Sequence, residues 1–311
     1  MRSRALALLL VAAAAAVAGC SEVPPATPEA LAHRQVRVAA TTNFITDLAR
    51  RIGGDRVRVS GLMGPGVDPH MYKASAGDVK TLAEADLVLY GGLELEGKMG
   101  DVFARLGEHR PTLAVTREIP RDRLLAEPRY PDRYDPHVWF DPQLWEHAAR
   151  TTAAALADLD PAHAGEYERN ARAYVRELRA LDAYARRRLA EIPERSRVLV
   201  TSHDAFRYLG RRYGLEVVAI QGVSTATEAT TADVERVAGV IADRGVRSVF
   251  VESSVPPQTI EAVLASASRQ GQDARIGREL FSDAAGAEGT PEGTYLGMVR
   301  HNADAIAEGL R

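Results

Sequence analysis

The sequence predicts an α/β protein of two lobes with mostly parallel sheets, bridged by one long helix. Strand and helix patterns alternate in two stretches, at about residues 35–158 and 194–311, and an uninterrupted helical pattern at 159–193 separates them. Alternating β and α segments favour parallel strands with helices on both faces of the sheet. Two such lobes leave a cleft between them, and ligands of parallel sheets bind beyond the carboxyl ends of the strands.

The N-terminus is typical of an export signal. Arg2 and Arg4 precede an apolar stretch at 5–18 that is too short to span a bilayer, and Val-Ala-Gly then leads into Cys20. Such a site resembles the lipobox of bacterial lipoproteins, and it predicts a signal peptide over 1–19 and lipidation of Cys20. The alternative is an ordinary signal peptide with an incidental cysteine. Residues 20–34, rich in Pro, Ala and Glu, are expected to form a lipid-anchored flexible tether.

Composition excludes several classes of protein. Of the 311 residues, 46% are hydrophobic and 26% charged, as in an ordinary globular protein. The net charge is −3, and no Lys/Arg cluster alternates with aromatic residues, so no nucleic-acid partner is expected. Cys20 is the only cysteine. Any metal site in the mature chain must therefore use histidines and carboxylates.

The first lobe begins the alternating pattern. The glycines at 53–54 end one helical stretch, Ser75 is an N-cap followed by Asp78 in the first turn, and Leu-Val-Leu-Tyr at 87–90 is typical of a buried parallel strand. Strands are expected at 36–41, 57–62, 86–90 and 113–115, and helices at 44–52, 75–84 and 99–106.

Two helices are expected in the middle of the chain, at 142–157 and 161–192. Asp160 is the expected N-cap of the second, with Pro161 at its first position, and Pro193 ends it. At 1.5 Å per residue this helix would run roughly 40 to 50 Å, which indicates a rigid strut between the lobes. A coiled-coil or partner-binding helix is the alternative, although no apolar heptad is sustained.

The second lobe resumes the alternation. Glycines at positions 214, 245 and 271 each end a helical pattern. Strands are expected at 197–201, 216–220, 249–251 and 275–277, and helices at 204–213, 231–244, 257–270 and 295–310.

Three histidines and one aspartate are candidate metal ligands. Residues 68–70 and 135–137 both read Asp-Pro-His, so proline presents His70 and His137 from stiff turns, where each aspartate can accept from an imidazole N–H or cap a helix. His203 follows an apolar strand, and Asp283 lies in a turn rich in Gly and Ala. Each alone is compatible with a solvated surface residue, but the set predicts a divalent-metal site in the inter-lobe cleft.

Other chemistries find little support. The chain has no H-E-x-x-H, no Gly-rich phosphate loop and no G-x-S-x-G elbow. A Ser-His-Asp triad could include Ser202, but no spacing favours it. The remaining histidines read as solvated or structural; they are His33, His109, His147, His163 and His301.

Longer motifs carry a family resemblance. They include Gly-Val-Asp-Pro-His at 66–70, Gly-Leu-Glu-Leu-Glu at 92–96, Asp-Pro-His-Val-Trp-Phe-Asp-Pro at 135–142, Thr-Ser-His-Asp-Ala-Phe at 201–206 and Leu-Phe-Ser-Asp at 280–283. Over nearly the whole mature chain, the sequence resembles the zinc/manganese-binding lipoproteins of bacterial ABC importers, the cluster A-I (cluster 9) solute-binding proteins. The resemblance implies two α/β lobes joined by a long helix, and the metal ligands His70, His137, His203 and Asp283.

The resemblance also implies a function. The protein is expected to be a monomer anchored to the bacterial membrane, at the cell surface or in the periplasm. It would bind Mn²⁺ or Zn²⁺ and deliver it to an ABC permease and its ATPase, without being an enzyme. A metal-dependent enzyme using the same site, and a surface adhesin, are the alternatives.

The choice between the two metals stays open. Zinc-dedicated members of the family often carry a His-rich loop in the first lobe, whereas residues 119–134 contain no histidine, which favours Mn²⁺ or mixed specificity. Imidazole ligands and the Irving–Williams order favour Zn²⁺ instead. We expect Asp283 to set the discrimination, with Glu252 as the next candidate ligand should Asp283 lie elsewhere.

Overall fold

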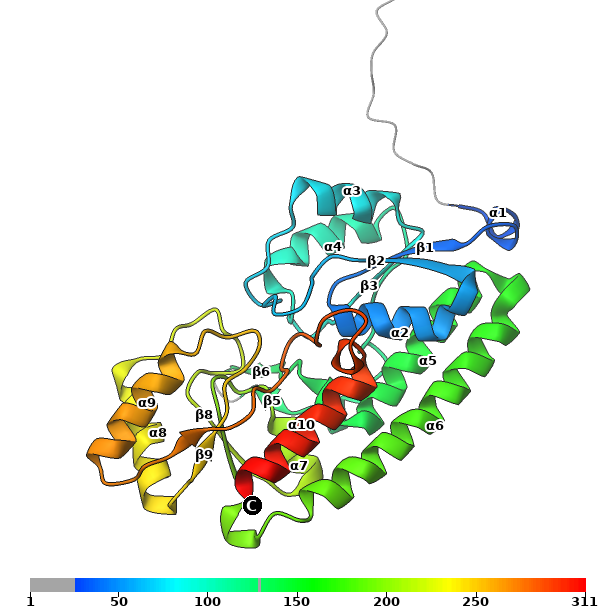
Figure 1. The fold of residues 1–311 in the computed structure, drawn as a ribbon. Coiled ribbons are helices and arrows are strands. Elements are labelled where there is room, and N and C mark those ends of the chain that lie inside the picture. The colour runs from blue at the N-terminus through cyan, green and yellow to red at the C-terminus, as the bar shows by residue number, and fades with distance from the viewer. Residues whose placement is uncertain (1–25, 128–129) are drawn as a thin grey trace, which may run out of the picture.

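The computed structural model describes residues 26–127 and 130–311 and has the expected α/β architecture with mostly parallel sheets (Figure 1). The expected signal peptide, Cys20 and the first part of the expected tether lie outside the described residues. None of the helices in the described ranges combines the length and the apolarity that a membrane span requires.

The first lobe is built on a four-stranded parallel sheet in the order β2-β1-β3-β4. All four expected strands are present. Apolar side chains of β1 and β3, such as Val38 and Leu89, are fully buried against the flanking helices. The strands are β1 (Val36–Ala40), β2 (Val57–Gly61), β3 (Leu87–Tyr90) and β4 (Thr112–Ala114), and the helices are α2 (Asn43–Gly53), α3 (Ala76–Glu84) and α4 (Gly100–Gly107).

The second lobe repeats this strand order. β7 pairs with β8 and β9 with β10, both in parallel, and the Phe250 N–H donates to the Val200 carbonyl at 2.9 Å, which joins the two pairs. The order is therefore β8-β7-β9-β10. The elements are β7 (Val198–Thr201), α7 (Arg207–Tyr213), β8 (Glu216–Ala219), α8 (Thr231–Arg244), β9 (Ser248–Val249), α9 (Gln258–Arg269) and β10 (Arg275–Ile276).

The long helix lies along one side of the molecule, and other helices pack along it (Figure 1). This helix, α6 (Ala164–Leu189), has 26 residues and contacts α5 (Pro142–Leu159), α2 and the C-terminal α10 (Tyr295–Leu310). A 3₁₀ turn, η5 (Pro161–His163), precedes α6, because the Asp160 carboxylate accepts from the His163 ring and the Tyr167 hydroxyl instead of capping a helix at 161.

Two segments differ from the expected pattern. The end of the expected tether forms a short helix, α1 (Pro28–Ala32), because Leu31 is fully buried and Arg56 donates to the Leu31 and Arg34 carbonyls. Within 119–134 the chain forms an antiparallel pair, β5 (Ala126–Glu127) and β6 (Tyr130–Tyr134).

Candidate metal centre

The four candidate ligands follow strands or turns at the facing edges of the two lobes. His70 lies in the loop after β2, and His137 directly precedes the 3₁₀ turn η4 (Val138–Phe140). His203 comes two residues after the end of β7, and α7 therefore begins at Arg207 instead of the expected 204. Asp283 lies in the segment after β10. Ligands at the carboxyl ends of parallel strands are the expected arrangement.

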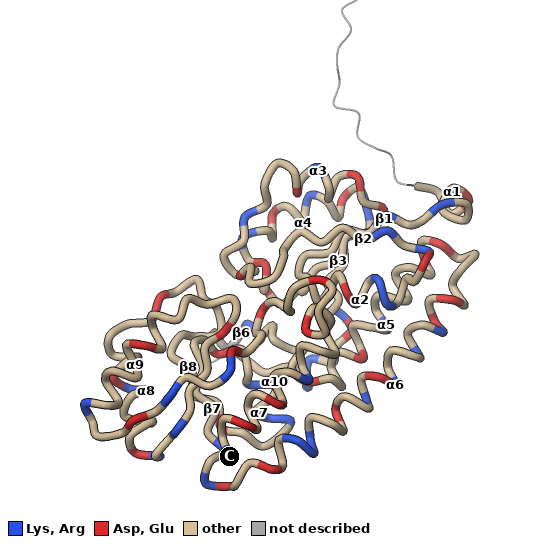
Figure 2. The backbone as a smooth tube through the Cα atoms, in the orientation of Figure 1, with Lys and Arg blue, Asp and Glu red and all other residues tan. Residues whose placement is uncertain are grey.

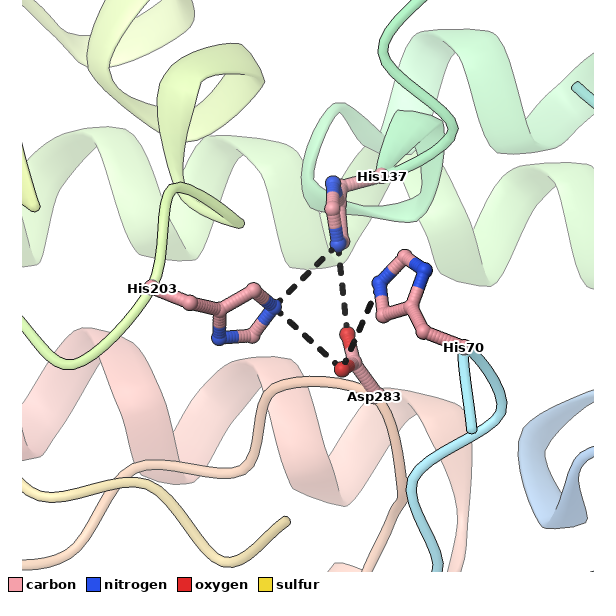
Figure 3. Close-up of side chains that lie close together, drawn as sticks. All are labelled: His70, His137, His203 and Asp283. Atoms are coloured by element: carbon pink, nitrogen blue, oxygen red, sulfur yellow. Dashed lines mark hydrogen bonds and ion pairs between the residues drawn. The ribbon is translucent and has the colours of Figure 1, made fainter. Parts of the chain in front are cut away.

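The structure brings the four side chains together (Figure 3). One potential ligand atom from each lies within 4.8 Å of the others. The Nε2 atoms of His137 and His203 are 3.3 Å apart, and each lies 3.3 Å from an oxygen of the Asp283 carboxylate. His70 Nε2 lies 3.8 Å from Asp283 Oδ2. The set predicted from the sequence is therefore a compact three-imidazole, one-carboxylate cluster.

Carboxylates behind the cluster hold two of the imidazoles. The Asp135 Oδ1 atom lies 2.8 Å from Nδ1 of His137 and also accepts the His137 backbone N–H at 3.0 Å. Glu252 does the same for His203, with Oε2 2.5 Å from Nδ1 and Oε1 2.8 Å from the backbone nitrogen. A carboxylate on Nδ1 directs Nε2 towards the metal and fixes the tautomer.

Glu252 is thus a partner of the His203 ring and not one of the four residues at the centre of the cluster. The sequence predicts Glu252 as a ligand only if Asp283 lies elsewhere, and Asp283 lies in the cluster; Glu252 is on the far side of the His203 ring from Asp283. Its buried carboxylate follows β9, one strand along from the β7 end that bears His203. The sequence signal that could have identified it is an acidic residue closing the apolar run at 249–251.

The two Asp-Pro-His repeats differ in what their aspartates do. Asp135 reaches the His137 ring, whereas Asp68 accepts only the His70 backbone N–H, at 2.8 Å. The other Asp68 oxygen accepts from the Thr225 hydroxyl of the second lobe at 2.6 Å.

The protonation of the site reflects these partners. Burial lowers the pKa of His70 to about 3, so this imidazole is neutral. Burial also opposes charge on His137, but Asp135 and Asp283 raise its pKa to about 9. Glu252 and Asp283 likewise outweigh burial at His203, and its pKa lies well above the usual value. The pKa of Asp283 is held well below its usual range, because His203 and His137 outweigh its burial.

A metal ion fits this donor set. His70 Nε2 and Asp283 Oδ1 are both buried and have no hydrogen-bond partner among the described residues. Unpaired buried polar atoms are costly, and a cation between them would satisfy both. Imidazole nitrogens and a carboxylate oxygen are ligands for Zn²⁺ and Mn²⁺ alike.

A cavity of about 300 Å³ opens beside His70, one of the four candidate ligands. Residues of both lobes line it, including Tyr130 of β6 and Thr227 of the second lobe. Two of its lining residues, Arg133 and Glu94, form an ion pair at 2.9 Å. Among the other histidines of the described ranges, His109 is exposed and His163 pairs with Asp160, so neither belongs to the cluster.

Comparison with known proteins places this fold and site in one family. Residues 38–309 match the family described as ZnuA, zinc-uptake complex component A, periplasmic. The chain is 46% identical over 280 residues to the manganese-binding lipoprotein MntA of Bacillus subtilis, covering 90% of this chain and 91% of that protein. It is 45% identical over 282 residues to the zinc-binding protein TroA of Treponema pallidum, covering 91% of each.

Among solved structures, the periplasmic zinc-binding protein TroA of Treponema pallidum superposes with a TM-score of 0.86 at 46% identity, covering 89% of this chain and 99% of that one. The two-lobed architecture and the long helix are thus shared with TroA. The chain belongs to the family of zinc-uptake complex component A, the cluster A-I metal-binding proteins that the motifs around its histidines resemble.

Proposed function

We propose that this protein captures one divalent transition metal ion, Mn²⁺ or Zn²⁺, outside the cytoplasm and delivers it to an ABC permease and its ATPase. The observation that carries the proposal is the convergence of His70, His137, His203 and Asp283 on one buried point. Several relatives bear names of metal ABC transporter substrate-binding lipoproteins, such as SsaB of Streptococcus sanguinis, which supports the transport role.

Capture fits the site better than catalysis. A catalytic zinc site has three protein ligands and keeps the fourth position open for water or substrate. Here four side chains converge on one centre, one more than the protein ligands of a catalytic zinc site. We therefore propose a binding protein, not an enzyme, that acts as a monomer. No feature of the cleft favours an adhesin.

The proposed cargo includes both metals. Three imidazoles suit Zn²⁺, while the two Asp283 oxygens face different histidines and could both bind a harder ion. The pair β5–β6 lies within residues 119–134 of the first lobe. Its sequence at 119–134 contains no histidine. We propose mixed Mn²⁺/Zn²⁺ binding, with Zn²⁺ held more tightly under equal concentrations.

Elemental analysis and competitive titration test the proposal. Protein purified without added metal should carry about one Mn or Zn per chain. His203→Ala should lose it, because the remaining ligands lack one corner of the shell. The matched control is His109→Ala, which removes an exposed histidine outside the cluster. Equal metal content in all three proteins would contradict the proposed site.

We also propose that Cys20 carries the lipid anchor. The small residues before Cys20 and the names of the lipoprotein relatives support this. Cys20→Ala should leave the protein unlipidated, and it should then no longer partition with membranes. A variant that partitions with membranes like the unaltered protein would refute the anchor while leaving metal binding untouched.

A further inference from the structure

Asp283 is the site residue whose position the local backbone explains least. It lies between β10 and the 3₁₀ turn η7 (Pro291–Gly293), a stretch with no helix or strand. Yet its carboxylate is fully buried, and its two oxygens face His137 and His203. A carboxylate on an irregular segment keeps one orientation only where the neighbouring backbone is held from outside.

Two asparagines hold that backbone, one on each side of Asp283. The Asn302 side chain accepts from the Phe281 N–H at 3.0 Å and donates to the Phe281 carbonyl at 2.7 Å. The Asn43 side chain accepts from the Ala285 N–H at 2.8 Å and donates to the Ala285 carbonyl at 2.7 Å. Each amide thus pairs with both polar groups of one residue, as a neighbouring strand would.

The two asparagines come from different parts of the molecule. Asn302 lies on α10, within the C-terminal part of the chain, whereas Asn43 is the first residue of α2 in the first lobe. Asp47 and Arg50 of α2 extend the attachment: Asp47 accepts the Tyr295 N–H at 3.0 Å and Arg50 pairs with Glu288 at 2.6 Å. The segment bearing Asp283 is therefore fastened to the first lobe, although it belongs to the second in sequence.

We propose that Asn43 is a positioning residue that sets the metal preference of the site through Asp283. The inference rests on the proposed metal-binding function. Asn43 makes no hydrogen bond to the four candidate ligands; it holds Ala285, and thereby the carboxylate two residues earlier, whose two oxygens face His137 and His203. Glu252 and Asp135 fix His203 and His137 independently of Asn43. Loosening the Asp283 backbone therefore weakens the oxygen ligand and spares two of the imidazoles.

The consequence differs between the two ions. Mn²⁺ depends more on carboxylate oxygen than Zn²⁺ does, because it is harder and takes more ligands. Asn43→Ala should weaken Mn²⁺ binding about tenfold or more, the usual scale for an outer partner of a metal ligand, and Zn²⁺ binding by less. Asn43→Asp keeps the shape but places an oxygen against the Ala285 carbonyl, and it should act in the same direction.

Competitive Mn²⁺/Zn²⁺ titrations of the full mature protein test this, with Asn170→Ala as the matched control. Asn170 also donates from its side chain to a backbone carbonyl, that of Ile52 at 3.0 Å, at the opposite end of α2 from Asn43. The visible spectrum of the Co²⁺-substituted protein supplies a readout that lost stability alone would not move. If Asn43 positions the Asp283 carboxylate, the Co²⁺ spectrum should shift in Asn43→Ala and stay constant in Asn170→Ala.

The outcomes separate the inference from the proposed function. Selective loss of Mn²⁺ with a shifted Co²⁺ spectrum supports the positioning role. Equal weakening of both metals with a lowered melting temperature, or no change in either affinity, overturns it. Unaltered protein that binds neither metal overturns the proposed function itself, and the inference with it.

Discussion

Asp283 supplies the single negative charge among the four side chains of the cluster. Its carboxylate partly neutralises a divalent ion and can bind through one or two oxygens, which an imidazole cannot do. Because the cluster is buried, the carboxylate interacts more strongly with a cation than it would in water. We therefore expect Asp283 to determine the preference of the site between Mn²⁺ and Zn²⁺.

Removing this carboxylate gives the first test. Asp283→Ala should weaken both metals, and Mn²⁺ by the larger factor, because the harder ion relies more on oxygen. Asp283→His should shift the preference towards Zn²⁺. Competitive titration measures both effects, with the exposed Asp122→Ala as control. Binding of Mn²⁺ by Asp283→Ala as tightly as by the unaltered protein would remove Asp283 from the site.

Proton linkage gives the second test. Metal binding needs neutral imidazoles, and the pKa of His137 is raised to about 9 in the metal-free protein. Below that pKa the ion must displace a proton, so affinity should rise with pH across neutrality, by about tenfold per pH unit for each proton displaced. His70 contributes nothing to this slope, because its pKa is lowered to about 3.

The window differs from that of three ordinary histidines, whose affinity would level off above about pH 6.5. Mn²⁺ titrations at about pH 6, 7.5 and 9 distinguish the two cases. A constant affinity between about pH 7.5 and 9 would show that neither His137 nor His203, whose pKa is also raised, holds a proton in the free protein.

The residues of the cluster could be named from the sequence, because the repeated Asp-Pro-His and the histidine after a strand have local signatures. An aspartate partner for an imidazole could be predicted from the Asp-Pro-His motifs, but which of the two reaches a ring could not. Asp68 and Asp135 occupy identical motifs and each accepts the backbone N–H of its histidine, yet only Asp135 also reaches the imidazole ring. Asn43 is 240 positions from Asp283 and shows no pattern of its own. Contacts between distant segments leave no local signal, so they appear only in the folded structure.

At the scale of elements, α6 stabilises both lobes through side chains that face α5, α2 and α10. Leu178 is fully buried on this face, within the largest apolar cluster of the protein. Its helical period and the absence of internal proline made the helix predictable. The sequence predicts a rigid strut between the lobes. The packing of α6 against α5, α2 and α10 depends on residues distant in the sequence.

Leu178→Ala tests this role of α6. Deleting a fully buried leucine should lower the free energy of unfolding by about 2–5 kcal/mol, through lost burial and a residual cavity. The exposed Arg187→Ala on the same helix is the control and should change it by less than about 0.5 kcal/mol. Urea denaturation of the metal-free proteins measures both, and an equal effect of the two substitutions would contradict the packing described here.

Elements with weak local signals were the ones that the sequence described poorly. The pair β5–β6 has short strands and a register irregularity, and α1 is held by Leu31 and Arg56 more than by any helical period. Strands of the first lobe, with continuous apolar runs, agreed within one or two residues. Local sequence patterns therefore predicted the main strands, whereas the short elements α1, β5 and β6 depend on tertiary contacts.

For the whole molecule, the arrangement of charge shows no single-signed face in the view of Figure 2, where basic and acidic residues alternate along α6. Binding should therefore depend on the cleft and not on a general surface field. The cleft itself is spanned by α6 and by the contacts of the Asp283 segment with α2. Both features limit how far the lobes can separate.

Solution scattering tests this limit. Large domain closure needs a few residues that absorb big changes in φ and ψ, and a continuous helix offers none. Metal-free and metal-loaded protein should therefore give nearly superimposable scattering curves, with the metal ordering the cleft loops. Curves that differ by a large domain closure would contradict the claim that α6 holds the two lobes in a fixed arrangement.

X-ray absorption at the metal edge of the loaded protein tests the central claim most directly. Four side chains that converge within 4.8 Å predict a shell dominated by three imidazole nitrogens with carboxylate oxygen, for Zn²⁺ and for Mn²⁺. His203→Ala should lose one imidazole from that shell, while His109→Ala should leave it unchanged. An all-oxygen shell, or one that both variants leave intact, would contradict a metal site built from His70, His137, His203 and Asp283.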